Sequence, residues 1–491
     1  MGESRYADLD DLELEAVGYK REMPRQFSLL SLGALSFTLT CTWLGTGSSV
    51  GISLTEASPA GAIWALPIAG FMTCIVSLGM AELASAYPVA GAQYYWSFMV
   101  AREDSITSLW YPDYEIRHWQ QWLIYVLLLW LAISLNIFAS NLIPLWNQMI
   151  FVLSVLVLSA TTIALFVCSR NSHAASSWIF ADTTNSTGWS SDGFAFILSV
   201  SNAVYAFLGS DAGAHLCEEI PNPGRNVPKV IIFPLIVGLI TAFPFACACM
   251  FSIIDLDSVL TTATGLPLIE IYYQGTGSKA AASFLMALFA FCFFGCLVAT
   301  TSSRALWAVS RDGAFPFSRL WSRVNRRFKM PMNAMILSGT CISLYGLIFL
   351  GSSTAFSAMV RAAIIFLQTS YIIPQAILLY RGRDKVLPER YFSLGIFGPA
   401  INLISILWVV FLDIVYCFPT AKPLKKENMN YTSVVCCGLV LFVVGLWYTS
   451  KKEKFTGPKI DMAQLTERRL VGIKGGLTEG VVRERLNLRA T

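Results

Sequence analysis

The sequence predicts an all-α, polytopic membrane protein, and three observations support this fold class. Of the 491 residues, 55% are hydrophobic and only 13% are charged, whereas a soluble domain carries about 25% charged residues. Long stretches hold almost no charge, and most Lys and Arg lie in the short stretches between them. The apolar runs lack the alternation of a membrane β-barrel, so each one is expected to satisfy its backbone hydrogen bonds as a helix.

The same composition argues against several other classes of protein. The net charge of +4 is small and scattered over loops, so it offers no electrostatic footprint for nucleic acid. The sequence contains no HExxH motif and no phosphate-binding glycine loop. The twelve Cys form no CxxC pair or zinc-type cluster, and many lie in apolar runs, where small buried residues are expected: Cys41, Cys74, Cys247, Cys292 and Cys437. We predict no catalytic residues, no metal, no cofactor and no enzymatic activity.

Eleven apolar runs are long enough to cross the hydrocarbon layer, which is roughly 30 Å thick and takes about 20 helical residues. They cover residues 27–56, 62–86, 119–140, 142–168, 193–217, 230–254, 280–303, 332–350, 354–380, 394–418 and 431–450. The polar, acidic residues before them lack the apolar core of a cleavable signal. We therefore expect a cytoplasmic tail over 1–26, a membrane domain over 27–450 and a second cytoplasmic tail over 451–491.

Basic loops predict the orientation, because Lys and Arg beside membrane spans are retained in the cytoplasm. The basic segments are 225–229, 304–329, 381–390 and the tail from Lys451. They alternate with loops that contain fewer Lys and Arg, and two of these loops contain N-glycosylation sequons, at Asn185 and Asn430. Sequons are used only outside the cytoplasm, so they agree with the charges. We predict that the 170–191 loop lies outside and the 304–331 loop inside.

The amino terminus conflicts with this orientation. Its basic residues Lys20, Arg21 and Arg25 also favour the inside, and eleven crossings from the inside end outside. Counting from both ends confines the missing crossing to residues 87–118. That segment contains charged residues that make a stable crossing too costly, namely Arg102, Glu103, Asp104, Asp113, Glu115 and Arg117. We infer that a helix of the parent architecture is missing near residues 97–112, through splicing, deletion or an erroneous gene structure.

Two of the apolar runs contain glycine-rich interruptions. The first run carries Gly45, Thr46, Gly47, Ser48, Ser49 and Gly51, and the fifth carries Gly209, Ser210, Asp211, Ala212 and Gly213. An interrupted helix frees backbone N–H and C=O groups, which then bind a substrate, an ion or water. Close helix packing through small residues is the other interpretation of each motif. The matched pair predicts a site for a small zwitterion or cation.

Three acidic residues are candidates for coupling or gating, because a charge at membrane depth costs about 3 kcal/mol on insertion scales. Asp211 lies one turn before His215, so a structural pair with that histidine is its alternative role. Glu82 lies near the inner end of the second run, where anchoring a loop is the favoured role. Glu218 and its neighbour Glu219 begin an inside loop, where simple solvation is the alternative.

Three segments resemble a known family. The stretch YAFLGSDAGAHLCEEIPNPGRNVPK, from Tyr205 to Lys229, closely resembles the sixth helix and following loop of fungal GABA and choline permeases. These permeases belong to the amino acid, polyamine and organocation (APC) superfamily. MAELASAYPVAGAQYYW (80–96) is similar to the end of their second helix, and GYKREMPRQFSLLSLGALSF (18–37) to the start of their first. The likeness extends from residue 18 to residue 450.

The resemblance implies the leucine-transporter-type fold, with two inverted five-helix repeats, two further helices and a substrate site between the broken first and sixth helices. The corresponding residues here are Trp43, Gly45, Thr46, Gly47, Ser48, Phe207, Gly209, Ser210, Asp211 and Gly213. In this chain the second broken helix is the fifth span instead of the sixth. The resemblance therefore identifies the missing helix as the third of the family's twelve, after Trp96.

These observations predict a secondary active transporter in the plasma membrane or the vacuolar membrane. The resemblance implies alternating access and proton-coupled uptake of amino acids or related amines, such as GABA or choline. Its partners would be the small-molecule substrate, protons and the lipid bilayer. Two alternatives stay open, a nutrient sensor with the permease fold and an inactive truncated permease. The 142–168 run has no charged residue that could carry a proton.

Overall fold

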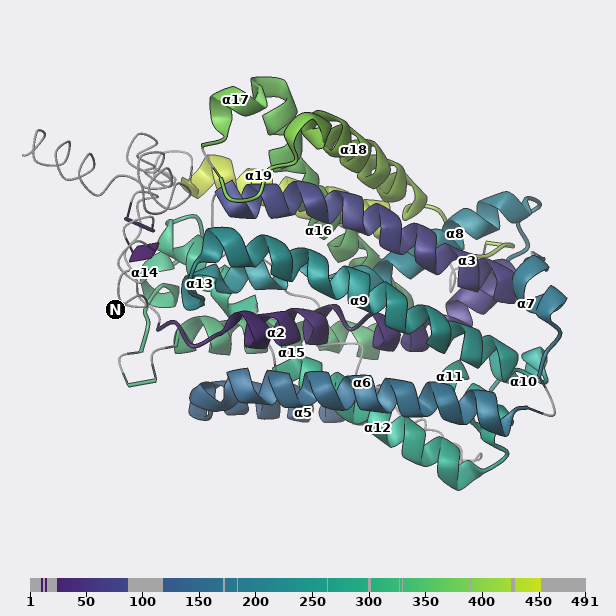
Figure 1. Ribbon diagram of the computed structural model, residues 1–491. Coiled ribbons are helices and arrows are strands. Elements are labelled where there is room, and N and C mark those ends of the chain that lie inside the picture. The colour runs from purple at the N-terminus through teal and green to yellow at the C-terminus, as the bar shows by residue number, and fades with distance from the viewer. Residues whose placement is uncertain are drawn as a thin grey trace, which may run out of the picture.

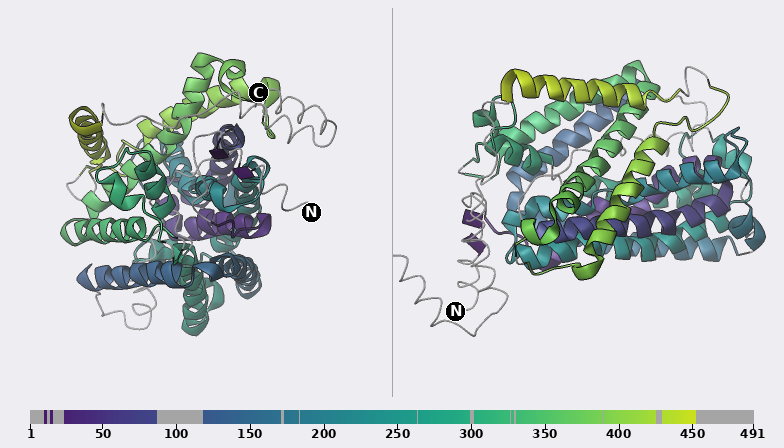
Figure 2. Two further views of the ribbon diagram at one scale, coloured as in Figure 1. Left: turned by 90° about the vertical axis from the view of Figure 1, so that its left-hand side faces the viewer. Right: turned by 90° about the horizontal axis from the view of Figure 1, so that it is seen from above.

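The computed structural model describes residues 10–11, 14–15, 24–86 and 118–451, apart from short gaps at 171–172, 183, 263, 299–301, 326, 329, 389 and 425–428. In these ranges the regular structure is helical, with one isolated β-bridge between Asn325 and Met330. Long helices lie side by side in a bundle (Figures 1 and 2). The predicted all-α membrane fold is confirmed. Most of both tails and the 97–112 segment lie outside the described residues.

The bundle is built from long helices and a few short ones. The long helices are α2 (Leu29–Thr40), α3 (Thr42–Ala86), α5 (His118–Phe138), α6 (Ile143–Cys168), α8 (Asp192–Val204), α9 (Pro223–Phe251), α12 (Lys279–Val298), α15 (Met332–Gly351), α16 (Ser353–Arg381), α18 (Gly398–Val415) and α19 (Thr432–Leu446). Two 3₁₀ segments, η3 (Tyr205–Phe207) and η4 (Ser210–Glu219), follow α8. Short helices occupy the loops: α7 (Ser176–Ala181), α10 (Leu256–Leu260), α11 (Pro267–Thr276), α13 (Ser302–Arg311), α14 (Ser318–Trp321) and α17 (Arg383–Val386).

Ten helical stretches within the described ranges are long and apolar enough to cross a membrane. The first of them, Leu29–Ala86, has 58 residues, which is about 87 Å of helix and nearly three times the hydrocarbon thickness. A sharp kink at Ala57 and Ser58 divides it, so it supplies two spans. The ten stretches therefore contain the eleven spans that the sequence predicts.

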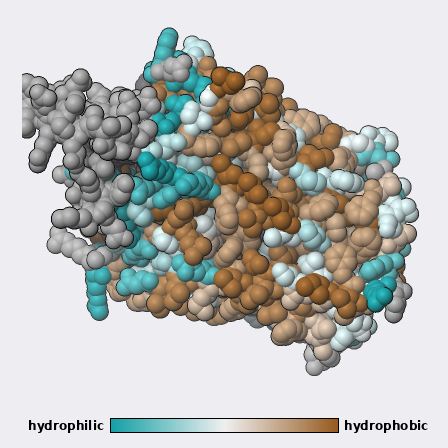
Figure 3. All heavy atoms as spheres, in the orientation of Figure 1, coloured by the Kyte–Doolittle hydropathy of each residue, from teal (hydrophilic) through white to brown (hydrophobic). Residues whose placement is uncertain are grey.

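A hydrophobic belt surrounds the bundle. Figure 3 shows hydrophobic side chains over the middle of the visible face and hydrophilic ones gathered toward its two ends. Large apolar side chains on this belt are about two-thirds exposed or more, among them Leu30, Leu127, Phe138, Ile240 and Leu441. Such a surface would be unfavourable in water but matches the hydrocarbon layer of a bilayer.

The two loops that contain the sequons meet at one end of the bundle. The backbone N–H of Lys422 donates to the carbonyl of Thr187 at 2.6 Å. The indole N–H of Trp189 donates to the carbonyl of Pro419 at 3.2 Å. Both sequons therefore lie at the same end, as the predicted orientation requires.

The basic loops gather at the opposite end, which we call the inner end. The helix α9 connects the two ends, because its first turns contain the basic residues Arg225 and Lys229, and its last residue, Phe251, accepts a hydrogen bond from Ala174 of the sequon-containing loop. At the inner end the N–H of Phe27 donates to the carbonyl of Glu219 at 3.1 Å. The guanidinium of Arg304 binds the Glu219 carboxylate at 3.1 Å. The amino-terminal segment and the 304–331 loop therefore share this end.

The chain leaves one end at residue 86 and returns at the other end at residue 118. Near the end of α3, the Ser85 hydroxyl donates to the carbonyl of Gly224 at 2.8 Å, at the inner end. We call the end opposite the inner end, where the sequon-containing loops meet, the outer end. At the start of α5, the His118 ring lies 4.9 Å from the ring of Phe349, which is near the outer end of α15. The orientation conflict predicted from the charges is therefore present in the structure, and the described spans are one crossing short.

Candidate functional site

The first interruption lies at Cys41, between α2 and α3. Cys41 has φ 43° and ψ 46°, the left-handed conformation, and it separates two helical segments. The predicted position of this break, at Gly45 to Ser49, is wrong by about one turn, because residues 45–49 are all helical. The hydroxyls of Thr46 and Ser48 donate to backbone carbonyls three or four residues earlier, as they do in an intact helix.

The glycines of this segment serve close packing. A Cβ atom at Gly45 would lie 2.8 Å from the Cα of Ala206 in η3. A Cβ atom at Gly47 would lie 2.9 Å from the ring of Phe289 in α12. Real Cβ atoms do not approach other atoms so closely, so glycine is needed for these contacts. Of the two interpretations of the first motif, the structure supports close packing.

The second interruption lies where the sequence predicts it. Leu208 is extended and Gly209 is left-handed, with φ 84° and ψ 10°, between η3 and η4. The hydroxyl of Ser210 lies 3.0 Å from that of Ser77 in the second half of α3. Gly213 lies within η4, where a Cβ atom would be 2.7 Å from the side chain of Val230. Gly209 therefore makes the break, and Gly213 allows η4 to approach α9.

The region around the two breaks is filled by aromatic side chains. Trp43 lies two residues after the first break, is 1% exposed, and its indole N–H donates to the Ser154 hydroxyl of α6 at 2.8 Å. The rings of Phe245 and Phe289 meet it edge-on, at 5.5 Å and 5.2 Å. The Phe207 ring instead lies against Gly70 of α3. Trp43 and Phe207 therefore belong to one core but pack in different places.

Asp211 links the second break to α16. It is 1% exposed and accepts a hydrogen bond from the Tyr371 hydroxyl at 2.8 Å through Oδ1. Its Oδ2 lies 3.1 Å from Nε2 of His215, one turn later. The structural pair with His215 is therefore present, together with a link to Tyr371 that sequence spacing could not reveal. Both oxygens of this buried carboxylate therefore have a partner.

Glu82 holds the loop that follows α16. Its carboxylate binds the guanidinium of Arg383 and that of Arg390, the latter at 2.9 Å, and accepts the backbone N–H of Leu394 at 3.2 Å. The side chain is almost fully buried. This is the geometry that the loop-anchoring interpretation requires.

Glu218 and Glu219 form two adjacent buried ion pairs. Arg311 contacts Glu218 with both terminal nitrogens, at 2.8 Å and 3.2 Å, and Arg304 contacts Glu219 at 3.1 Å. Glu218 is 5% exposed and Glu219 is 1% exposed. The alternative of simple solvation is therefore wrong, because the end of η4 is tied to α13 by these pairs.

Three further ionisable residues lie inside the predicted spans and are not among the predicted site residues: Glu56, Arg361 and Asp413. Glu56, the last residue before the kink in α3, is 3% exposed and interacts electrostatically with Arg361 of α16. Asp413 of α18 accepts a hydrogen bond from the Thr369 hydroxyl of α16 at 2.9 Å. The signal for all three is a charged residue within an apolar run, which is rare without a partner or a use.

The two candidate glycosylation sites differ in their surroundings. The Asn185 side chain is half-buried and donates to Asp192 at 2.5 Å. Asn430 is 8% exposed, and its amide nitrogen donates to the carbonyls of Tyr416 and Phe418, each at 2.7 Å. A glycan on Asn430 would take the place of one of the two amide hydrogens and so remove one of these bonds.

Comparisons with known proteins agree with this architecture. The profile of the family described as amino acid permease matches residues 99–442, more than half of the chain. The choline transporter of Saccharomyces cerevisiae is 32% identical over 482 residues, which cover 91% of this chain and 85% of that protein. Amino-acid permease BAT1 of Arabidopsis thaliana is 29% identical over 510 residues, which cover 92% of this chain and 96% of that protein. The alignment with a solved structure of Mhp1, a nucleobase-cation-symport-1 family transporter, covers 92% of this chain and 99% of that one, at 12% identity and a TM-score of 0.43.

The lengths of the alignments show that this chain has gaps relative to its relatives. The alignment with the choline transporter is 482 residues long but covers only 91% of this 491-residue chain, so it includes gaps in this chain. The alignment with BAT1, at 510 residues, is longer than the whole chain. Within the aligned regions these two relatives therefore have residues that this chain lacks. The extent of the family match and the identity with the choline transporter together show that this chain belongs to the amino acid permease family.

Proposed function

We propose that this chain is a secondary active transporter for amino acids or related amines, such as GABA or choline, and that it works by alternating access. The observation that carries the proposal is the pair of interrupted helices, at Cys41 and at Leu208 to Gly209, which approach each other where Gly45 meets Ala206. Paired interruptions of this kind offer helix ends and free backbone groups to a polar substrate at membrane depth.

The side chains beside the breaks favour a small ligand with a positive centre. Asp211 supplies a buried carboxylate one helical turn from His215, and Trp43 supplies a large aromatic ring near the first break. Both groups attract cations, the carboxylate by charge and the indole by its π-electrons. The relatives, a choline transporter and an amino-acid permease, are named for substrates of this class.

Protons are the coupling ion in this proposal, with Asp211 as the carrier. Its supports are the resemblance to the family and the placement of a titratable carboxylate directly after the second break. The helix α6 contributes only uncharged polar groups, such as Asn147 and Ser154. Glu82 and Glu218 are both held in ion pairs, so they fit a structural or gating role better than proton transport.

The test is uptake of radiolabelled choline, GABA and neutral amino acids by proteoliposomes that contain the purified chain, with and without an inward proton gradient. We expect saturable uptake of one of these substrates that the gradient increases. A nutrient sensor would bind the same substrate without net uptake, so binding is measured in the same vesicles. Binding without uptake would contradict transport.

One observation favours a second candidate, an inactive truncated permease. The chain leaves the inner end at residue 86 and returns at the outer end at residue 118, and the described spans are one crossing short. In the family fold the third helix lines the substrate cavity. A chain without it would leave polar backbone groups at the breaks next to lipid, at a cost of several kcal/mol for each group.

A further inference from the structure

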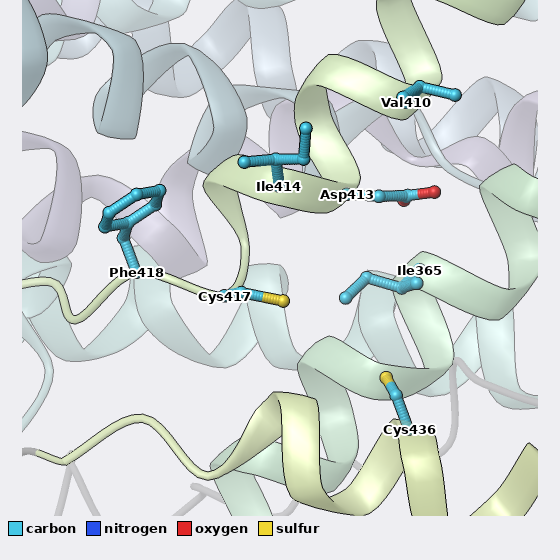
Figure 4. A pocket seen from close by; sticks show the side chains of 7 residues that line it. All are labelled: Ile365, Val410, Asp413, Ile414, Cys417, Phe418 and Cys436. Carbon is cyan, nitrogen blue, oxygen red and sulfur yellow. The ribbon is translucent and has the colours of Figure 1, made fainter.

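A separate pocket lies between α16, α18 and α19, away from the two breaks. Its volume is about 540 Å³, and its walls include Ile365, Val410 and Ile414. It also contains the carboxyl group of Asp413 and the thiols of Cys417 and Cys436. Figure 4 shows the side chains of Asp413 on α18, Cys417 on the turn after α18 and Cys436 on α19 around this space. The volume is within the range of pockets that hold small organic ligands, roughly 300–1,000 Å³.

Asp413 has a free hydrogen-bond acceptor. Its Oδ2 accepts the hydroxyl of Thr369 at 2.9 Å. Its Oδ1 is buried and has no hydrogen-bond partner among the described residues. A carboxylate oxygen without a donor in apolar surroundings is unfavourable, so it favours a ligand that brings one.

The position of Asp413 in α18 tells how a ligand would lie. The helix ends at Val415, two residues later, so Asp413 lies about 3 Å from the helix end. Val410 adds apolar wall to the pocket about one turn deeper along α18, and Ile365 adds apolar wall from α16, one turn nearer the outer end than Thr369. The nearby Cys417 precedes the loop that contains the Asn430 sequon, so this is the end that the sequence places outside. A ligand would therefore have its polar head at Asp413, near the outer end of α18, with apolar wall around it.

We propose that this pocket binds an amphiphile with an ammonium head group, taken from the outer leaflet of the membrane. An N–H of the head donates to Oδ1 of Asp413, and the hydrocarbon part lies against Ile365, Val410 and Ile414. An ammonium is favoured over a hydroxyl because a charge-assisted hydrogen bond is about twice as strong as a neutral one. The pocket involves neither break, so the proposal goes beyond the transport of a polar substrate.

The two thiols supply a direct readout. The chain is reconstituted in phosphatidylcholine vesicles and treated with N-ethylmaleimide, and alkylation of each cysteine is followed by peptide mass spectrometry. Dodecylamine is the probe, and dodecanol is its uncharged match with the same hydrocarbon chain. Cys168 and Cys341 are exposed in the structure and lie outside the pocket, so they report any general effect of the amphiphile on reactivity.

We expect dodecylamine to protect Cys417 and Cys436 but not Cys168 or Cys341, with half-protection at a concentration about tenfold lower than dodecanol requires. Asp413→Asn should remove this difference, and Asp413→Glu, which keeps the charge, should retain it. Ile365→Trp should remove protection by both compounds because it fills the pocket. Equal protection by the amine and the alcohol, or unchanged preference in Asp413→Asn, would overturn the proposal.

Discussion

Gly209 is the residue whose backbone conformation makes the second break. Its φ of 84° lies in the left-handed region, where a residue with a side chain costs roughly 1–2 kcal/mol. We expect Gly209→Ala to abolish uptake while the protein still reaches the membrane, because the change shifts the turn that joins η3 to η4. Gly277→Ala is the matched control, since Gly277 has φ 66° but open space around it in a loop. Uptake and surface biotinylation are compared, and similar uptake by the two variants would count against a role at the break.

Asp211 is the residue that distinguishes proton coupling from simple structural pairing. In Asp211→Asn the new amide can keep the hydrogen bond from Tyr371 but does not titrate. We expect this variant to retain substrate binding and to lose the increase in uptake caused by an inward proton gradient. Asp257→Asn, on an exposed short helix, is the control. A variant at position 211 that responds normally to the gradient would exclude Asp211 as the proton carrier.

At the scale of the elements, η4 is fixed at the inner end by its two ion pairs with α13. Removing one partner of a buried pair leaves an uncompensated charge and costs about 3–5 kcal/mol. We expect Arg304→Ala to lower the thermal unfolding temperature clearly in detergent, and Arg319→Ala, at an exposed position of the same loop, to leave it nearly unchanged. The double variant Glu219→Ala, Arg304→Ala should be less destabilised than Arg304→Ala alone, and a strictly additive loss would refute the coupling.

The loops at the outer end predict the pattern of glycosylation. Asn185 lies in a loop between two helices, while Asn430 is buried and lies two residues before α19. We expect Asn185→Gln to remove the shift in mobility produced by a glycosidase in a eukaryotic host, and Asn430→Gln to leave it unchanged. Labelling of a cysteine introduced in the 304–331 loop should require permeabilised cells. Labelling of that cysteine in intact cells would reverse the orientation.

The elements also show which features can be predicted from sequence. All eleven spans follow from hydropathy, and Gly209 was identifiable because glycine adopts the left-handed conformation more readily than other residues. The break at Cys41 was not, because a left-handed cysteine has no sequence signal and the glycines beside it are used for packing. The pairing of Glu218 with Arg311 joins residues 93 positions apart, so it depends on the topology of the bundle. Local spacing could indicate only the pair of Asp211 with His215.

At the scale of the whole molecule, the missing crossing leads to a comparison of two chains. One is the chain as it stands, and the other carries the third helix of a relative between Trp96 and Trp110. We expect the second chain to reach the surface in larger amounts and to take up substrate faster per molecule, because the inserted helix would line the cavity and remove the orientation conflict. Equal surface level and equal uptake would show that the architecture tolerates the loss.

The opposite positions of residues 86 and 118 also affect how the chain is made. During synthesis, α3 delivers residue 86 to the inner face, and the thirty-one residues from 87 to 117 must reach the outer face before α5 inserts. Fully extended, they span about 100 Å, which is ample, but six of them are charged, and loops this short are sorted by their charges. We expect nascent chains to divide into two topological isomers, one with α5 as described and one with α5 inverted. The ratio of these isomers then limits how much folded protein a cell can obtain from each transcript.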